Sequence, residues 1–403
     1  MNKSPDLEYL LENLLTNTSD SIYFKDAQSR FVLVNQACAV KHGWDSEKIK
    51  GKTDFDTFSK DHAERAYADE RRIIETGEPL FSIEERETWP DGRVTWVSTT
   101  KMPIRDDNGE IIGLFGITRD ITDRKRAATR VRLYAEEVNT IKEEMENDVR
   151  MAGKLQKNFM PTSYPAFPAG AAPADQHIEF LHRFNLNRQV SGDYCAVTRV
   201  SDHEAGIFLC DVQGVGVRAA LGTALVRGVV QEIQGLAADP AAYLGRMNAM
   251  LSPLLRKEGM LLDVSACYFT LDARTGAIRL ASAGHTMPIH FRDGYAAQWL
   301  CDGAACAGPP LGVDPAAGYV AIEQTISADD SVVAFTDGLY TVRNNMDDAY
   351  GKKRLLDSAH SLAGESLADV FSGLEGDALA FSKTGKFSDD VCLVGFHLKT
   401  LMP

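Results

Sequence analysis

One stretch of this 403-residue chain has apolar residues spaced alternately three and four positions apart, and it separates an N-terminal segment from a C-terminal one. Within residues 127–159 the repeating core positions are Val131, Tyr134, Val138, Ile141, Met145, Asp148, Ala152, Leu155 and Phe159. A heptad repeat of this length, with no glycine before Gly153, is typical of a long helix that pairs with a second helix. We therefore expect a parallel homodimeric coiled coil. The alternative is a single amphipathic helix packed on the chain's own domains.

Length and charge narrow the possibilities for the segments on either side of this helix. Domains usually hold about 100–200 residues, so the length predicts two or three domains.

The composition disfavours several classes of partner and site. The formal net charge of −14 disfavours nonspecific binding to phosphate backbones, and nucleic acid is not an expected partner. No apolar run approaches the roughly 18 residues of a membrane span, so we expect a cytoplasmic protein with no membrane partner. The seven cysteines include no CxxC pair, which predicts neither a disulfide framework nor a zinc site.

The first 123 residues have the pattern of a small α+β module. Residues 6–15 are amphipathic and predict a short opening helix, and residues 64–76, closed by Gly77, predict another. The expected strands are 21–25, 30–34, 81–88, 93–103 and 111–121. The last three strands are separated by turn pairs of the Asp-Gly and Asn-Gly type, so we expect them to form a meander.

This module resembles a PAS sensor domain. The matching segments are Tyr23-Phe24-Lys25-Asp26, Phe31-Val32-Leu33-Val34-Asn35, Gly113-Leu114-Phe115-Gly116 and Asp120-Ile121-Thr122. The resemblance implies a signal sensor, but it does not name the ligand. The Asn-Cys-Arg-Phe signature of flavin photosensors is absent, so we expect Cys38 to be a small buried residue. His62 stands about one helical turn too early for a haem ligand, and we expect it at the surface or capping a helix.

Acidic residues in the C-terminal half stand at the ends of strand-like runs or in turns bounded by glycine. They are Asp193 in Ser-Gly-Asp-Tyr, Asp211 in Cys-Asp-Val-Gln-Gly, Asp337 in Thr-Asp-Gly, and the pair Asp389-Asp390. A carboxylate beside glycine is exposed where backbones can approach closely. A single Asp-Gly turn is usually only a turn, but several carboxylates together provide the hard oxygen ligands that Mg²⁺ and Mn²⁺ prefer.

The order and flanks of these residues resemble the metal-dependent serine/threonine phosphatases of the PPM type. The similarity is to their bacterial branch, typified by the sporulation stage II E and general-stress regulatory phosphatases. Other matching segments are Ala152-Gly153-Lys154-Leu155-Gln156, Met160-Pro161, Ala219-Ala220-Leu221, Ala283-Gly284-His285 and Pro310-Leu311-Gly312. The resemblance implies two stacked antiparallel sheets flanked by helices, an α/β/β/α sandwich.

We therefore expect an α+β multidomain protein. Its parts would be a PAS sensor domain at 1–123, a coiled-coil linker helix at 124–160 and a phosphatase domain at 161–403. In the phosphatase domain the expected strands are 205–212, 264–272, 277–283, 331–336 and 391–398, and the expected helices are 218–233 and 241–255.

The resemblance also implies a set of metal ligands. Asp211 would bridge two Mn²⁺ or Mg²⁺ ions. The Val212 carbonyl and Asp193 would complete one ion's site, and Asp337 and Asp389 the other's. Asp390 would be a neighbour of these ligands.

A metal-activated water would then hydrolyse a phosphoserine or phosphothreonine in line, without a phosphoenzyme. The substrate implied by the resemblance is a phosphorylated anti-sigma-factor antagonist, a protein that acts by partner switching. The PAS domain would control the reaction through the dimeric coiled coil. From its position alone, five residues before Asp193, Arg188 is a candidate to hold the substrate phosphate.

Two other functions stay open. Four positions differ from what is usual in the family, namely Ser191, Val215, Ser282 and Thr341, so the C-terminal half could be a catalytically weak module that binds a partner. The Ser191–Tyr194 turn also has a superficial similarity to diguanylate cyclases, without their second acidic residue. We expect His285 to stabilise a turn rather than to act as a general acid.

Overall fold

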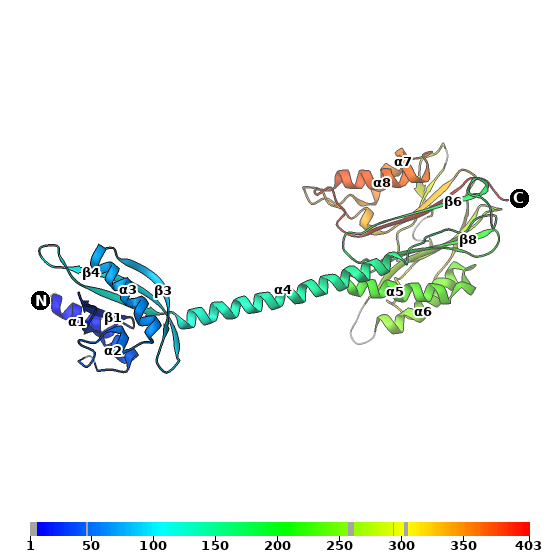
Figure 1. The fold of residues 1–403 in the computed structure, drawn as a ribbon. Coiled ribbons are helices and arrows are strands. Elements are labelled where there is room, and N and C mark those ends of the chain that lie inside the picture. The colour runs from blue at the N-terminus through cyan, green and yellow to red at the C-terminus, as the bar shows by residue number, and fades with distance from the viewer. Residues whose placement is uncertain (1–5, 46, 257–261, 293, 302–304) are drawn as a thin grey trace, which may run out of the picture. The chain divides into compact units, whose positions relative to one another are not determined.

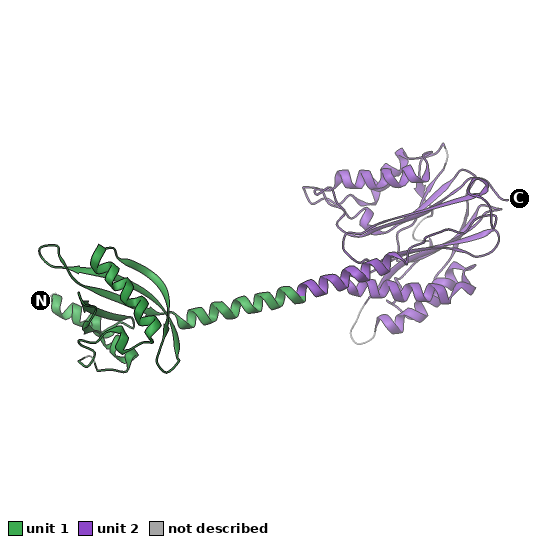
Figure 2. Cartoon of the chain, viewed as in Figure 1, with its two compact units in different colours: residues 1–141 green, residues 142–403 purple. Residues whose placement is uncertain are grey.

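The computed structural model describes residues 6–45, 47–256, 262–292, 294–301 and 305–403. The chain divides into two compact units, residues 1–141 and 142–403 (Figure 2). Helix α4 (Thr122–Lys157) runs through the division between the units. The expected domain limits at 123 and 160 therefore stay predictions.

The first unit is one antiparallel sheet with helices. Its elements are α1 (Leu7–Asn17), β1 (Ser21–Asp26), β2 (Phe31–Val34), α2 (Gln36–His42), the 3₁₀ helix η1 (Asp54–Asp56), α3 (Lys60–Thr76), β3 (Leu80–Thr88), β4 (Val94–Arg105) and β5 (Ile111–Asp120). The strand order is β2-β1-β5-β4-β3. The five expected strands and two expected helices are present, and α2 is an addition. Asn35 caps α2 by accepting the Cys38 N–H, and Gly43 ends it, so the helix is too short for its periodicity to be read.

Helix α3 turns one face toward the sheet. Its buried residues are His62, Ala63, Ala66, Glu70 and Ile73, at the three- and four-residue spacing of a single helix face. The expectation for His62 is wrong, because only 6% of this residue is exposed. A histidine in the first turn of a helix is often a capping residue. In α3, however, the first turn packs against the core, so the histidine is buried.

The heptad segment forms the single long helix α4, as predicted. Thr122 fixes its start, because its hydroxyl accepts the Trp96 N–H of β4 at 2.9 Å. Val131, Val138 and Met145 of the heptad stripe are 62–68% exposed, and their pairing with a second helix stays a prediction. Although α4 is the longest helix, neither it nor any other described helix is long and apolar enough to cross a membrane.

Among its described residues, the second unit contains two sheets and the helices α5 to α8 after α4. Its strands are β6 (Ile178–Asn185), β7 (Asp193–Arg199), β8 (Glu204–Val212), β9 (Val264–Asp272), β10 (Ala277–Ala283), β11 (Ile289–Phe291), β12 (Gln298–Trp299), β13 (Ala307–Gly308), β14 (Ile322–Thr325), β15 (Ser331–Phe335) and β16 (Val391–Leu398). Its helices are α5 (Val217–Glu232), α6 (Pro240–Leu255), α7 (Gly351–Ser361) and α8 (Leu367–Phe381), with the 3₁₀ helices η2 (Pro173–Asp175), η3 (Gln234–Leu236) and η6 (Asp337–Leu339).

The two sheets of this unit stack face to face. One has the order β13-β10-β9-β8-β7, with β14 beside β10, and the other has the order β12-β11-β15-β16-β6. Helices α5 and α6 cover the outer face of the first sheet, and α7 and α8 cover that of the second (Figure 1). The expected α/β/β/α sandwich is therefore confirmed. Its main core includes Leu209 and Cys267 of the first sheet and Val394 and Phe396 of the second.

Candidate metal centre

Each sheet of the sandwich places two of the candidate aspartates at the ends of two neighbouring strands. Asp193 begins β7 and lies directly opposite Asp211 of β8 in the antiparallel register. Asp337 follows β15 and Asp389 precedes β16, and these two strands are also antiparallel neighbours. Antiparallel pairing thus brings residues that are far apart in sequence to two adjacent strand ends.

Thr336 connects the strand ends of one sheet to those of the other sheet. Its hydroxyl donates to Oδ2 of Asp193 at 2.7 Å and accepts the N–H of Cys392 at 2.9 Å. Asp193 is 2% exposed and Thr336 is fully buried, so water does not compete for these bonds. The first sheet's aspartates therefore meet those of the second sheet, and Thr336 is a site residue that the sequence analysis missed.

Two glycines of the motifs permit close backbone approach. A Cβ atom on Gly192 would lie 2.5 Å from the Val212 carbonyl oxygen and 3.1 Å from Oδ1 of Asp211. A Cβ atom on Gly338 would lie 1.9 Å from the carbonyl oxygen of Asp390. Neither position has room for a side chain, so glycine is required here for packing between the segments that carry the carboxylates.

The acidic side chains repel one another. Burial, followed by the charge of Asp211, raises the pKa of Asp193 well above its usual value. Burial also raises the pKa of Asp211, and the charges of Asp337 and Asp389 add to the increase. The pKa of Asp337 is raised by burial and by Asp389. Mutual repulsion of this kind is expected where several carboxylates lie together without enough positive charge.

The residues suit a divalent cation. The cluster is made of hard carboxylate oxygens, which Mg²⁺ and Mn²⁺ prefer, and its excess negative charge is what a bound cation would neutralise. In the part of the chain that the structure describes, no three His, Cys, Asp or Glu side chains form a ready cage for one ion. Mg²⁺ usually keeps several waters in its coordination shell, so carboxylates that are spread apart can still contribute to its binding.

Asp390 ties the metal-site loop to the segment that contains Arg188. Its Oδ1 accepts the backbone N–H of Asn187 at 2.7 Å, and the Arg188 N–H also donates to this carboxylate. The Arg188 side chain is exposed. The sequence placed Arg188 near Asp193, and the structure adds that its backbone is held by the neighbour of Asp389.

A cleft of about 230 Å³ opens beside Asp211 and Asp337, with Thr286 and Tyr340 among its walls. His285 also lines it, but burial lowers the pKa of this histidine to about 4, so its ring is neutral near pH 7. Its Nε2–H donates to the Phe335 carbonyl at 3.2 Å, which leaves Nδ1 to accept the Ser265 hydroxyl at 2.9 Å. The ring is held within the fold, as expected for a structural histidine.

The end of α4 is bonded directly to the Ser191-Gly192-Asp193 turn. The Gln156 side chain donates to the Ser191 carbonyl at 2.5 Å and accepts the Ser191 N–H at 2.9 Å. Both residues are buried, at 4% and 1% exposure. A Cβ atom on Gly153, one turn earlier, would lie 2.0 Å from the Gln189 carbonyl oxygen. Gln156 therefore belongs to the site, although its sequence position indicated only a family landmark.

Two of the four unusual positions have structural roles. The Ser191 hydroxyl accepts the N–H of Asp193 at 3.0 Å. The Ser282 hydroxyl donates to the His285 carbonyl at 3.0 Å and accepts the His285 N–H at 3.1 Å, which closes the turn. Val215 is 56% exposed. The serines therefore supply hydrogen bonds to the loops on which the site depends.

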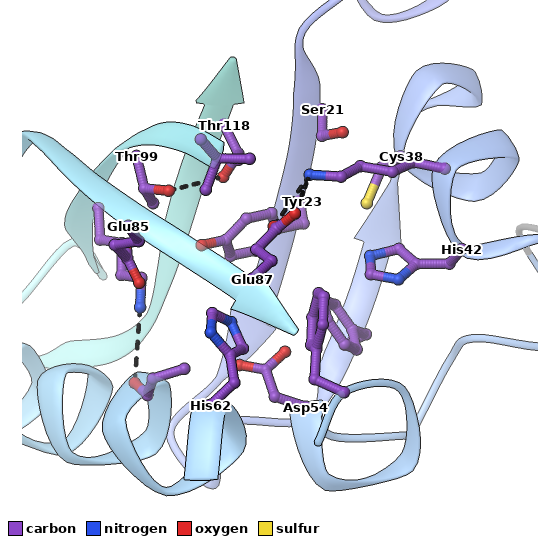
Figure 3. Close-up of a pocket in the computed structure, with 16 residues that line it drawn as sticks. Ser21, Tyr23, Cys38, His42, Asp54, His62, Glu85, Glu87, Thr99 and Thr118 are labelled. Atoms are coloured by element: carbon purple, nitrogen blue, oxygen red, sulfur yellow. Dashed lines mark hydrogen bonds and ion pairs between the residues drawn. The ribbon is translucent and has the colours of Figure 1, made fainter. Parts of the chain in front are cut away.

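A second candidate site is a cavity within the first unit, between the sheet and helices α2 and α3. Figure 3 shows the side chains of Tyr23, His42 and His62 converging on it from three different elements. The hydroxyls of Thr99 and Thr118, on neighbouring strands, lie 3.3 Å apart at its wall. The space that a water-sized sphere can occupy is about 40 Å³.

Comparison with known families gives two matches. Residues 201–399 match the model of stage II sporulation protein E, and residues 15–126 match the PAS fold. The first match contains Asp211, Asp337 and Asp389, and begins after Asp193. The second contains the cavity-lining residues of the first unit.

Individual relatives resemble one or both parts. Phosphoserine phosphatase RsbP of Bacillus subtilis is 22% identical over 255 residues, 62% of this chain and 58% of that protein. Methanogenesis regulatory histidine kinase FilI of Methanothrix harundinacea is 32% identical over 120 residues, 30% of this chain and 13% of that protein. This chain thus spans less than two thirds of either relative. Among solved structures, the SiaA PP2C domain of Pseudomonas aeruginosa has a TM-score of 0.53 at 20% identity, over 64% of this chain and 98% of that chain.

Proposed function

We propose that this chain, which joins a PAS domain to a metal-dependent phosphatase domain of the stage II sporulation protein E type, hydrolyses phosphoserine or phosphothreonine on a protein. The expected order of sensor and phosphatase domains is confirmed. The observation that carries the activity is the meeting of Asp193, Asp211, Asp337 and Asp389 at adjacent strand ends. The matches also favour a phosphatase over the cyclase alternative.

Five residues would hold two divalent ions, Mn²⁺ or Mg²⁺. Asp211 would contribute to both sites, Asp193 and the Val212 carbonyl to one, and Asp337 and Asp389 to the other. Bound ions would supply charge stabilisation at the phosphoryl group and a water of lowered pKa. Carboxylates of raised pKa are suited to this role, because a cation favours their charged form and so binds at the expense of protons.

The chain's own groups would orient the ligands and admit the substrate. The Thr336 hydroxyl fixes one oxygen of Asp193, and the Ser191 hydroxyl fixes the backbone N–H of the same residue. The cleft beside Asp211 and Asp337 would receive the phosphoserine side chain, whose small size fits a space of about 230 Å³.

Arg188 would hold the substrate phosphate. Its exposed side chain extends from a loop that Asp390 anchors, and a guanidinium can bind two phosphate oxygens at once. We expect Arg188→Ala to raise KM for a phosphoprotein about tenfold or more, with a smaller effect on kcat, because a charge-assisted bidentate contact is lost. Steady-state phosphate release measures both constants. An unchanged KM would remove Arg188 from the site, and Arg274→Ala, on an exposed turn, is the matched control.

The substrate would be a phosphorylated anti-sigma-factor antagonist, so that dephosphorylation drives partner switching. This step rests on the family resemblance and on similarity to RsbP, itself a phosphoserine phosphatase. Control would pass from the PAS domain through a dimeric coiled coil formed by α4. The bond between Gln156 and Ser191 supports that route, because it joins the last turn of α4 to the Asp193 turn.

The deciding experiment is phosphate release from a phosphoserine protein with Mn²⁺, with Mg²⁺ and with chelator. We expect metal-dependent activity in the wild type, its loss in Asp211→Asn, and its retention in Asp202→Asn, an exposed loop control. If no metal supports turnover, deletion of residues 1–122 separates two explanations. Activity of the truncated chain would mean that the sensor holds the enzyme off. Continued inactivity with intact substrate binding would favour the catalytically weak binding module.

A further inference from the structure

Three sulfur atoms meet in the main core of the second unit. Cys301 lies shortly after β12, Cys306 directly precedes β13, and Met287 lies shortly before β11. The Cys301 Sγ is 3.3 Å from the Met287 Sδ and 3.4 Å from the Cys306 Sγ, and the Cys306 Sγ is 3.5 Å from the Met287 Sδ. The two Sγ atoms are not joined in a disulfide, whose S–S bond is about 2.05 Å long. Three segments of the chain thus place their sulfur atoms at the corners of one triangle.

The triangle has the dimensions of a metal site with three sulfur ligands. Because its sides are nearly equal, one point lies about 2.0 Å from all three sulfur atoms. A zinc–thiolate bond, for comparison, is about 2.3 Å long. An ion about 1.2 Å out of the plane of the triangle would reach that length, as would an opening of the triangle by a few tenths of an ångström. The Met287 side chain suits such an adjustment, because methionine is unbranched and has three rotatable bonds.

The kind of ligand selects a soft ion. Thiolate and thioether sulfurs are ligands that Cu(I) takes, whereas zinc sites are built from Cys, His, Asp or Glu. Within the described ranges of the chain, no third Cys, His, Asp or Glu joins these two cysteines in a ready metal cage. The third sulfur is therefore that of a methionine, which favours Cu(I) over Zn²⁺. The carboxylates of the candidate metal centre are hard ligands, so the two sites differ in the ions that they prefer.

The three residues are enclosed but not sealed from solvent. Cys306 is 2% exposed, and Cys301 and Met287 are 6% and 8% exposed. Surroundings of low dielectric constant strengthen the attraction between a cation and a thiolate. The remaining exposure of Cys301 and Met287 leaves a path by which an ion can enter, which a metal site requires.

We propose that Cys301, Cys306 and Met287 form a binding site for a single Cu(I) ion. Its ligands are the two thiolate sulfurs and the thioether sulfur. The ion takes the place of the thiol protons, so binding releases protons and becomes stronger as pH rises. No electron is transferred in this step. The proposal does not depend on phosphatase activity, because its test measures metal binding alone.

The test is competition for Cu(I) between the full chain, reduced and kept free of oxygen, and the coloured Cu(I) chelator bicinchoninate. We expect the chain to withdraw one equivalent of Cu(I), with the ultraviolet absorption of Cu(I)–thiolate bonds, even in excess Zn²⁺ and Mn²⁺. Cys301→Ala should weaken this binding about tenfold or more, since even the loss of a group that only supports a metal ligand has an effect of that size. Cys195→Ala is the matched control, because it removes another buried thiol, 3.9 Å from the Met160 Sδ, and should leave the binding unchanged.

A milder variant guards against misfolding. Met287→Leu nearly conserves the volume of the side chain and removes the thioether, so it should weaken Cu(I) binding in a chain whose far-UV spectrum is unchanged. Met247→Leu, at a buried position of α6, is its control and should bind Cu(I) as the wild type does. The proposal would be overturned if the reduced wild type withdrew no Cu(I) from the chelator, or if Zn²⁺ displaced the bound ion. Unaltered affinity in the folded Cys301→Ala and Met287→Leu proteins would overturn it as well.

Discussion

Single buried hydrogen bonds decide the geometry of the candidate metal centre. Thr336 is the clearest case, because one hydroxyl donates to Asp193 and accepts from the strand that follows Asp389. A buried group that loses its partner destabilises the fold by about 1–3 kcal/mol. The carboxylates are thus positioned by residues that have no role in binding a metal themselves.

Asp193→Asn should remove one cause of the pH dependence of folding stability in the metal-free protein. The folded-state pKa of Asp193 is raised, so its contribution to stability is complete below about pH 4, the usual pKa of aspartate, and is lost as pH rises through the raised value. The free energy of unfolding of wild type, relative to Asp193→Asn, should therefore fall as pH rises above 4. Denaturant unfolding of the second unit within the full chain measures this difference.

The control for this prediction is Asp202→Asn, which removes one carboxylate at an exposed position outside the acidic cluster. Excess Mg²⁺ should oppose the trend, because a cation among the carboxylates favours their charged forms. A pH-independent difference for Asp193→Asn in chelator would contradict the pKa shift.

The candidate site could be predicted from sequence only as far as its acidic residues. Asp-Gly turns after hydrophobic runs are visible in a sequence, and the structure places Asp193, Asp211, Asp337 and Asp389 at neighbouring strand ends. Thr336 and Gln156 were not identified as site residues, because their importance comes from partners 143 and 35 positions away. Such contacts depend on sheet stacking and helix docking, which have no local sequence pattern.

At the scale of elements, the last turn of α4 is the point where the linker helix meets the site. Gln156 pairs with the backbone of Ser191 in the manner of one peptide group with another, and Gly153 allows the helix to approach the Gln189 backbone. The Thr223 hydroxyl of α5 contacts the same turn, at 3.2 Å from the Ser191 carbonyl and 3.1 Å from that of Gly192. Two helices therefore hold the turn that begins β7.

Gln156→Leu should impair metal use more than it impairs folding. Leucine keeps the apolar contacts of the side chain but leaves the buried Ser191 N–H without its partner, and leaves the Ser191 carbonyl with the Thr223 hydroxyl alone, so the Asp193 turn is less well fixed. We expect the Mn²⁺ concentration for half-maximal phosphate release to rise about tenfold. Gln298→Leu, at an exposed position of β12, is the control. If the metal requirement is unchanged while stability falls, Gln156 is only a packing residue.

Insertions into α4 should alter activity periodically. Each residue added between Val138 and Met145 lengthens the helix by about 1.5 Å and rotates the C-terminal part of the helix by about 100°. A seven-residue insertion restores the phase of the heptads, so it should retain regulated activity that one- to three-residue insertions change. Phosphate-release rates across the series are the measurement. An equal rate for every insertion would exclude transmission through the paired helices.

Many elements were predictable from periodicity, whereas α2, α7, α8, β6, β7 and β11 to β14 were not predicted. β9, β10 and β16 match their expected ranges, because each is a hydrophobic run bounded by turn residues. α2 was not predicted, because seven residues are too few for a helical period to be distinguished. One reason for β6 is that only Ile178 and Phe180 are fully buried, while the rest of the strand carries several charged and polar side chains.

At the scale of the whole molecule, the pairing of α4 would determine the assembly. Val131, Val138 and Met145 are exposed in the single chain, and pairing would remove this apolar stripe from water. The N-terminal helix α1 also has no buried residue among its described positions. A homodimer is consistent with both features.

Ile141→Asp should convert the dimer to a monomer. A charge at a core position of the heptads is unfavourable in the paired state and is well solvated in the separate chain. Light scattering should give about twice 44.2 kDa for wild type and about 44.2 kDa for the variant. Thr140→Asp, one residue away on the outer face of the predicted coiled coil, should remain dimeric. A monomeric wild type would contradict the pairing itself.

Every residue of α4 from Arg126 to Asp148 is exposed. Near the first unit, Arg126 and Leu133 line a hollow together with Trp96 of β4, whereas the heptad positions Val138 and Met145 face solvent. Helix α4 therefore has the features of a helical connector between the two units. We expect that a different N-terminal domain could replace the first unit without any change in the second unit, provided that it ends in the same heptad phase.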